Sequence, residues 1–196
     1  MAKETRYFES TIKRAIPSDA EKQSRMVEGY AAVFSSMSKK LGWFTEEIAP
    51  DAFKNCDMSD VVALFNHNTD LVLARTPKTL TLSVDERGLK YSFEAPNTTY
   101  GNDLLVSLDR EDIRTSSFAF DIESEEWTWG ENGAPDHRKI ISISKLYDVS
   151  PVTYEAYPDT DCAKRSAEEA KKEQADKTGI VERQLASAQL DLLRLK

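Results

Sequence analysis

Residues 79–95, TLTLSVDERGLKYSFEA, contain the pattern that most constrains the fold of this chain. Apolar and polar residues alternate on both sides of the central ERG sequence. The apolar positions are Leu80, Leu82 and Val84 before the turn and Leu89, Tyr91 and Phe93 after it. Because successive side chains of a strand point to opposite faces, the segment predicts a β-hairpin.

Other short segments predict further strands, and two segments predict helices. Strands are expected over residues 6–16, 25–35, 60–66, 113–122 and 138–152, with Gly29 marking a bulge or a close approach. Helices are expected over residues 48–56, starting near Pro50, and over residues 97–112. Polar loops are expected at 35–42 and 127–137. Many short strands with two inserted helices predict a mainly β (α+β) fold, a closed or nearly closed antiparallel β-barrel.

The sequence changes in character after Cys162. Residues 163–177 contain no large apolar side chain, which is typical of a solvated helix or a disordered linker. Residues 179–196 are amphipathic, with a heptad-like seam of Val181, Leu185, Ala188, Leu192 and Leu195. This helical tail either packs back on the body or forms a coiled coil with a partner. We therefore predict a domain over 1–162 and a tail over 163–196.

Charge is distributed unevenly and argues against nucleic-acid binding. The net charge is −8 and the isoelectric point is near 4.9. Residues 163–196 hold 8 basic and 6 acidic side chains, which leaves 18 basic and 28 acidic side chains in the rest of the chain. Broad nucleic-acid binding usually requires a basic stripe, and none is evident.

The sequence gives no sign of export or membrane insertion. No stretch approaches the ~20 apolar residues that span a bilayer, and MAKETRYFES lacks the apolar core of a signal peptide. Two cysteines, Cys56 and Cys162, are too few for a disulfide framework and fit a reducing cytoplasm.

Metal and cofactor chemistry have little support in the sequence. There is no HExxH motif, no cysteine pair at ligand spacing and no glycine-rich phosphate loop. We therefore expect neither a metal nor a cofactor. Paired carboxylates such as Glu46–Glu47 are abundant in an acidic chain and indicate a solvated face.

Histidine is scarce, so any histidine base must be His67 or His137. His67 follows the apolar strand of ALFNHNTD, whereas His137 lies in the polar loop GENGAPDHRK. A catalytic base needs a fixed ring orientation and partial shelter from water. The end of a buried strand provides both better than a loop does, although a structural role for either histidine stays open.

Strand alternation separates the two serines of IRTSSFAF. Ser116 shares a face with Phe118 and Phe120, which is the core face, and Ser117 shares a face with small residues. A substrate backbone could approach the small-residue face closely, so Ser117 is the better candidate nucleophile. The alternative is that both serines are simple strand residues.

Asp148 is an acid near the end of the largely apolar strand RKIISISKLYDVSPV. A serine nucleophile needs a base, and that base needs an orienting partner. Asp148 could be that carboxylate for His67, or it could be an ordinary aspartate before the turn at Pro151.

Taken together and in order, these segments resemble the prohead serine proteases of tailed bacteriophages. The resemblance covers about residues 26–161 and is carried by GYAAVFS, EEIAPDAF, ALFNHN, LART, RTSSFAF and LYDVSPVTYEAYPDT. It implies a fold related to the herpesvirus protease assemblin. It also implies that the family histidine is His67, the nucleophile Ser117 and the acid Asp148. The herpesvirus relatives use a second histidine as the third member, and His137 is the only other histidine. Alanine at position 119 and aspartate at position 148 depart from the glycine and glutamate common in the family.

The resemblance also implies a role in capsid maturation. Such proteases act inside the immature prohead in the host cytoplasm, cut the scaffold segments of the major capsid protein, and cut themselves. The tail would then serve in encapsidation, self-association or self-cleavage. A non-enzymatic assembly or scaffolding factor is the alternative, whereas an α/β-hydrolase is excluded because the chain has no GxSxG motif.

Overall fold

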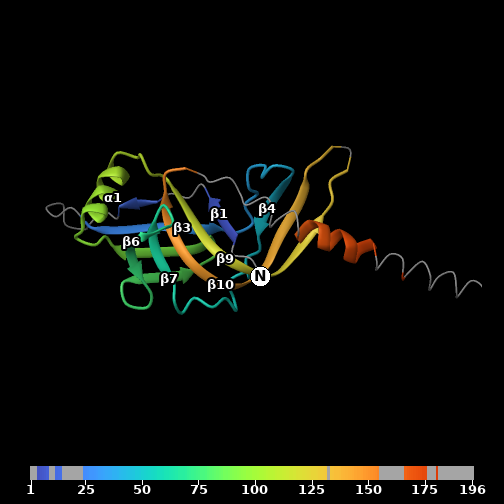
Figure 1. The fold of residues 1–196 in the computed structure, drawn as a ribbon, viewed down its shortest axis with the longest axis horizontal. Coiled ribbons are helices and arrows are strands. Elements are labelled where there is room, and N and C mark those ends of the chain that lie inside the picture. Colours follow the sequence, from blue (N-terminus) through green and yellow to red (C-terminus); the bar gives the residue numbers. More distant parts are fainter. Residues whose placement is uncertain are drawn as a thin grey trace, which may run out of the picture. The chain divides into compact units, whose positions relative to one another are not determined.

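A computed structural model describes residues 4–8, 12–14, 24–131, 133–154, 166–175 and 180 (Figure 1). The chain divides into two compact units, Met1–Asp159 and Thr160–Lys196. The first unit holds all the named strands and helix α1 (Thr99–Asp109). The predicted division into a protease domain over 1–162 and a tail over 163–196 stays a prediction.

The first unit is built from two β-sheets. The larger sheet has the order β1-β9-β10-β5-β6, and β4 also pairs with β10. Its strands are β1 (Glu4–Phe8), β4 (Phe44–Ile48), β5 (Val62–Phe65), β6 (Asn68–Arg75), β9 (Thr115–Thr128) and β10 (Asp136–Val152). The smaller sheet, in the order β2-β3-β8-β7, contains β2 (Lys13–Arg14), β3 (Met26–Val33), β7 (Leu80–Val84) and β8 (Gly88–Glu94). Figure 1 shows β9 and β10 as two long neighbouring strands.

The core lies between the two sheets and is continuous. Phe118 and Phe120 of β9 stack with ring centroids 4.6 Å apart, and both are fully buried together with Leu89 and Tyr91 of β8. The hairpin predicted over 79–95 is confirmed as β7 and β8, with Leu80 opposite Phe93 and Val84 opposite Leu89. Gly29 lies opposite Tyr91, where an added Cβ would be 3.1 Å from the tyrosine oxygen.

The prediction of a closed antiparallel barrel is wrong. The larger sheet curls into a half-barrel, and no ladder joins it to the smaller sheet among the described residues. It is also mixed, because β10 runs parallel to both β4 and β5. Alternation within a segment reveals a strand but not its partner, so sheet closure and strand direction could not be read from it.

Three further predictions are corrected. Residues 6–16 do not form one strand, because β1 and β2 belong to different sheets. No helix follows Pro50. The Ala52 carbonyl, which would accept from Cys56 in an α-helix, accepts instead from the Ile143 amide at 2.9 Å. Residues 127–137 are not all loop, since β9 continues to Thr128 and β10 starts at Asp136.

The second helix expected, over 97–112, is confirmed as α1. Thr98 caps its start by accepting from the Gly101 amide at 3.2 Å. In the second unit a helix spans residues 166–175, and the heptad-like seam over 181–196 lies outside the described residues. No described helix combines the length and apolar character needed to cross a membrane.

Candidate functional site

Three neighbouring strands bring the predicted site residues together. Ser117 of β9 lies opposite Ser150 of β10, and Ala119 lies opposite Asp148. Asp148 also pairs in parallel with Val62, so the strand leading to His67 lies on the other side of β10. Side chains that lie opposite each other on adjacent strands share a face. The sheet therefore gathers a hydroxyl, a carboxylate and an imidazole on one face.

His67 is held in a two-residue turn between β5 and β6. Phe65 lies opposite Asn68, which leaves Asn66 and His67 as the whole connection. Both have positive φ, 54° and 56°, as a type I′ hairpin turn requires. Asn66 fastens the turn to the end of β10, because its Oδ1 accepts from the Thr153 amide at 2.9 Å. The position of the imidazole is thus fixed from two strands.

A continuous set of close contacts joins the three side chains, which we call the candidate triad. His67 Nδ1 lies 2.5 Å from Asp148 Oδ1, and His67 Nε2 lies 2.5 Å from Ser117 Oγ. With the Nδ1 proton donated to Asp148, Nε2 can accept the proton of Ser117. This is the arrangement in which an imidazole can act as a general base on a hydroxyl.

Ser150 is a fourth polar side chain at this site. Its hydroxyl donates to Asp148 Oδ1 at 3.0 Å and lies 3.2 Å from His67 Nδ1. This hydrogen bond helps to fix the Asp148 carboxylate from within the same strand. Sequence reasoning did not single out Ser150, although its position two residues after Asp148 on the same strand face was a usable signal.

Ser116 has a different environment from Ser117. Its hydroxyl lies 2.7 Å from Tyr91 Oη inside the core. Burial raises the pKa of Tyr91, so this is a pair of neutral hydroxyls. The structure therefore puts the two adjacent serines on opposite faces of β9, with His67 beside Ser117.

His137 lies away from the candidate triad, and Cys56 is not an activated thiol. His137 is at the far end of β10, where Nδ1 lies 3.3 Å from Thr45 Oγ1. Asp148 lies eleven positions further along the strand, a span of roughly 35 Å. Burial, followed by the nearby Asp57 charge, raises the pKa of the Cys56 thiol to about 12. A thiol with that pKa is a poor nucleophile at neutral pH.

Five buried or half-buried charged residues form an ion cluster on the opposite face of β9. Its members are Glu4, Arg6, Glu46, Glu125 and Arg138. Arg6 donates to Glu46 at 2.6 Å and also contacts Glu4, whereas Arg138 donates to Glu4 at 2.8 Å and also contacts Glu125. Burial alone would lower the pKa of both guanidinium groups, but the adjacent carboxylates outweigh it and raise both. The prediction of a solvated face for the Glu46–Glu47 pair is wrong for Glu46, whose side chain is 1% exposed. The cluster was not foreseen because its members come from four strands.

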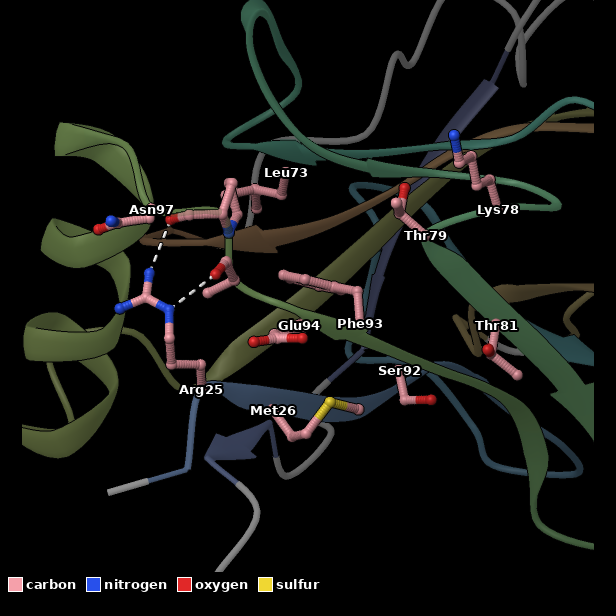
Figure 2. A pocket seen from close by; sticks show the side chains of 12 residues that line it. Arg25, Met26, Leu73, Lys78, Thr79, Thr81, Ser92, Phe93, Glu94 and Asn97 are labelled. Atoms are coloured by element: carbon pink, nitrogen blue, oxygen red, sulfur yellow. Dashed lines mark hydrogen bonds between the residues drawn. The ribbon is translucent and has the colours of Figure 1, made fainter. Parts of the chain in front are cut away.

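A pocket of about 690 Å³ opens beside the smaller sheet (Figure 2). Its lining includes Leu73, Lys78 and Phe93, and Arg25 donates to the carbonyls of Ala95 and Pro96 at its edge. No member of the candidate triad lines it. Among the described residues, no group of three or more His, Cys, Asp or Glu side chains is placed to hold a metal ion.

Comparison with known proteins gives one match. A family model described as caudovirus prohead serine protease matches residues 11–173, which is most of the chain and includes Ser117, His67 and Asp148. No curated protein and no solved structure matches. A serine nucleophile is the chemistry that this family description implies, and a hydroxyl–imidazole–carboxylate set lies within the matched residues. The chain therefore belongs to the caudovirus prohead serine protease family and is a serine peptidase of phage capsid maturation.

Proposed function

We propose that Ser117, His67 and Asp148 are the catalytic triad of this peptidase. His67 takes the proton of Ser117 as the Oγ attacks the carbonyl carbon of a peptide bond. The resulting imidazolium is stabilised by Asp148 and then protonates the leaving amine. Water hydrolyses the acyl-enzyme by the same proton transfers in reverse. The pair of 2.5 Å contacts that His67 makes with Ser117 and Asp148 is the observation that carries the proposal.

We further propose that the substrates are segments of the major capsid protein, its scaffold segment included, and the protease itself. Membership of the prohead protease family supports an action on capsid proteins inside the prohead. That prohead would be assembled in the host cytoplasm. The tail over 163–196 is proposed as a segment for self-association, for docking on the scaffold or for self-cleavage.

Co-expression with the major capsid protein tests the triad. Ser117→Ala should abolish processing of the capsid protein and of the protease chain, seen as intact masses in mass spectrometry. Ser116→Ala is the matched control, because it removes the adjacent hydroxyl on the other face and should leave processing intact. Processing that persists in Ser117→Ala would remove Ser117 from the mechanism.

A further inference from the structure

Strand β1 covers the proposed nucleophile. It is the edge strand of the larger sheet and pairs antiparallel with β9, with Tyr7 opposite Ser117 and Arg6 opposite Phe118. Ser117 is fully buried, while the His67 side chain keeps 21% of its surface exposed. Solvent therefore reaches the proposed base but not the proposed nucleophile. A buried nucleophile cannot attack a peptide substrate, so the site is inactive in this state.

The backbone of β1 also competes with the base for the nucleophile. Ser117 Oγ donates to the Arg6 carbonyl oxygen at 2.9 Å and lies 2.5 Å from His67 Nε2. A hydroxyl has a single proton, so it cannot donate to both acceptors at once. The main chain of β1 thus occupies the space that a peptide substrate must enter.

We propose that the edge of β9 held by β1 is the substrate-binding edge, and that an extended peptide with a basic side chain binds there by replacing β1. The inference rests on Ser117 as the proposed nucleophile. Peptides commonly bind by adding a strand to a sheet edge, where main-chain hydrogen bonds give affinity and side-chain pockets give specificity. With β1 in place that edge is closed, so β1 masks the site.

The ion cluster supplies the preference for a basic side chain. Arg6 donates to Glu46 through Nε at 2.6 Å and through Nη2 at 3.1 Å. When β1 leaves, it removes Arg6 and Glu4 together, so Arg138 remains with Glu46 and Glu125. One positive and two negative charges remain in a largely dry site, and an arginine or lysine would neutralise the excess negative charge. An acidic side chain in that position would be repelled.

The position of the carbonyl indicates which peptide bond would face Ser117. The Arg6 carbonyl is the group beside the Ser117 hydroxyl. A substrate bound in the same register would present the carbonyl of its basic residue there. The basic residue would then lie immediately before the bond that is cut. Strand β1 (Glu4–Phe8) lies before residue 11, the first residue that the family model matches, so the match does not include this strand.

Loosening β1 in the full chain tests the masking. Arg6→Ala removes the side chain that fastens β1 to Glu46, and it should speed labelling of Ser117 by a fluorophosphonate at least about tenfold. Arg14→Ala is the matched control, since Arg14 fastens β2, the next strand along the chain but in the other sheet, to Asp109 at 2.5 Å and should leave labelling at the wild-type rate. If circular dichroism shows that Arg6→Ala does not fold, Arg6→Lys replaces it, with a smaller increase expected. Labelling of the folded variant at the wild-type rate would overturn the inference.

A peptide added in trans tests the occupant. The peptide KETRYFES, which copies residues 3–10, should bind the Arg6→Ala/Ser117→Ala double variant in a fluorescence anisotropy titration. Replacing its arginine by lysine should change the affinity only a few fold, whereas glutamate should weaken it at least about tenfold. Equal affinities for the arginine and glutamate peptides would refute the role of Glu46.

The outcomes also separate this inference from the proposed triad. If the arginine peptide binds selectively but Ser117 is never labelled in any variant, the peptide site stands and the assignment of Ser117 fails. If Ser117 is labelled equally in wild type and Arg6→Ala and no peptide binds, the triad stands and the masking role of β1 fails.

Discussion

The candidate triad and the ion cluster lie on opposite faces of strand β9, and they differ in how completely their polar groups are paired and buried. In the ion cluster every charge meets an opposite charge, and Arg138 and Glu46 are each only 1% exposed. In the candidate triad one carboxylate meets one imidazole and one hydroxyl, and His67 remains partly exposed. Because each charge in the ion cluster is paired with an opposite charge, the cluster stabilises the positions of the strands. In the candidate triad the hydroxyl proton of Ser117 lies beside the His67 imidazole, which could accept it. One face of β9 thus holds the sheet together, and the other carries the proposed catalytic residues.

The largest expected effect is on activity, through Asp148. Asp148→Asn keeps the size of the side chain but removes the charge that stabilises the His67 imidazolium. It should lower kcat by about 10³- to 10⁴-fold with little change in Tm. Peptidase assays and a thermal melt on the same preparation check this. Asp121→Asn, a change on the same pair of strands, is the control and should keep near-normal kcat.

The next effect is on stability, through Arg138. Arg138→Ala removes the guanidinium that Glu4, Glu46 and Glu125 all contact, although Arg6 still pairs with Glu4 and Glu46. It should lower the free energy of unfolding by about 3–5 kcal/mol. Arg75→Ala is the control, because its pair with Asp60 is 58% exposed on both sides and its loss should change the free energy of unfolding far less. Urea denaturation measures both. Equal losses would show that burial of the ion cluster adds nothing.

Ser150 should have an intermediate effect as a positioning residue. Ser150→Ala removes the hydroxyl that donates to Asp148, and should lower kcat roughly tenfold with KM unchanged, since one hydrogen bond to a charged group is lost. The pH profile of kcat should shift as well, because the carboxylate that orients His67 has changed its partners. A variant with reduced activity and an unshifted profile would indicate a structural role alone.

The smallest effect concerns acid stability. Burial alone would raise the pKa of Glu4, but Arg138 and Arg6 outweigh it and hold that pKa below its ordinary value of 4.5. Glu4 therefore contributes stability that is fully present above pH 4.5 and is lost as the pH falls through its lowered pKa. Glu4→Gln should lower stability near neutral pH and flatten its decline below pH 4.5, as denaturant titrations at several pH values would show. A decline as steep as that of wild type would assign the acid sensitivity to other carboxylates.

The sequence indicated which side chains lie together better than it indicated how the strands pair, and the catalytic role of Ser117, His67 and Asp148 stays a proposal. Period-two alternation placed Ser116 and Ser117 on opposite faces, because that argument needs only the strand that holds them. Sheet closure and the parallel pairing of β10 could not be inferred, because they depend on which strands meet. Strand β6 was missed because the turn of Asn66 and His67 has no glycine, although both residues adopt positive φ. The ion cluster was missed because charges far apart in sequence are usually solvated.

Strand β10 has a consequence for how this sequence can vary. It pairs with β4 at its start, with β5 near its end and with β9 along most of its length. Because Arg138 and Asp148 lie on this one strand, the number of residues between them sets the spacing of the ion cluster and the candidate triad. A single-residue insertion or deletion in a regularly paired stretch of the strand would exchange the inward and outward positions of the residues beyond it. The register shifts between Ile140 and Asp148 are the places where an extra residue has been absorbed. Length changes among related proteins should therefore collect at these bulges and at the β9–β10 turn, and be absent from residues 148–152.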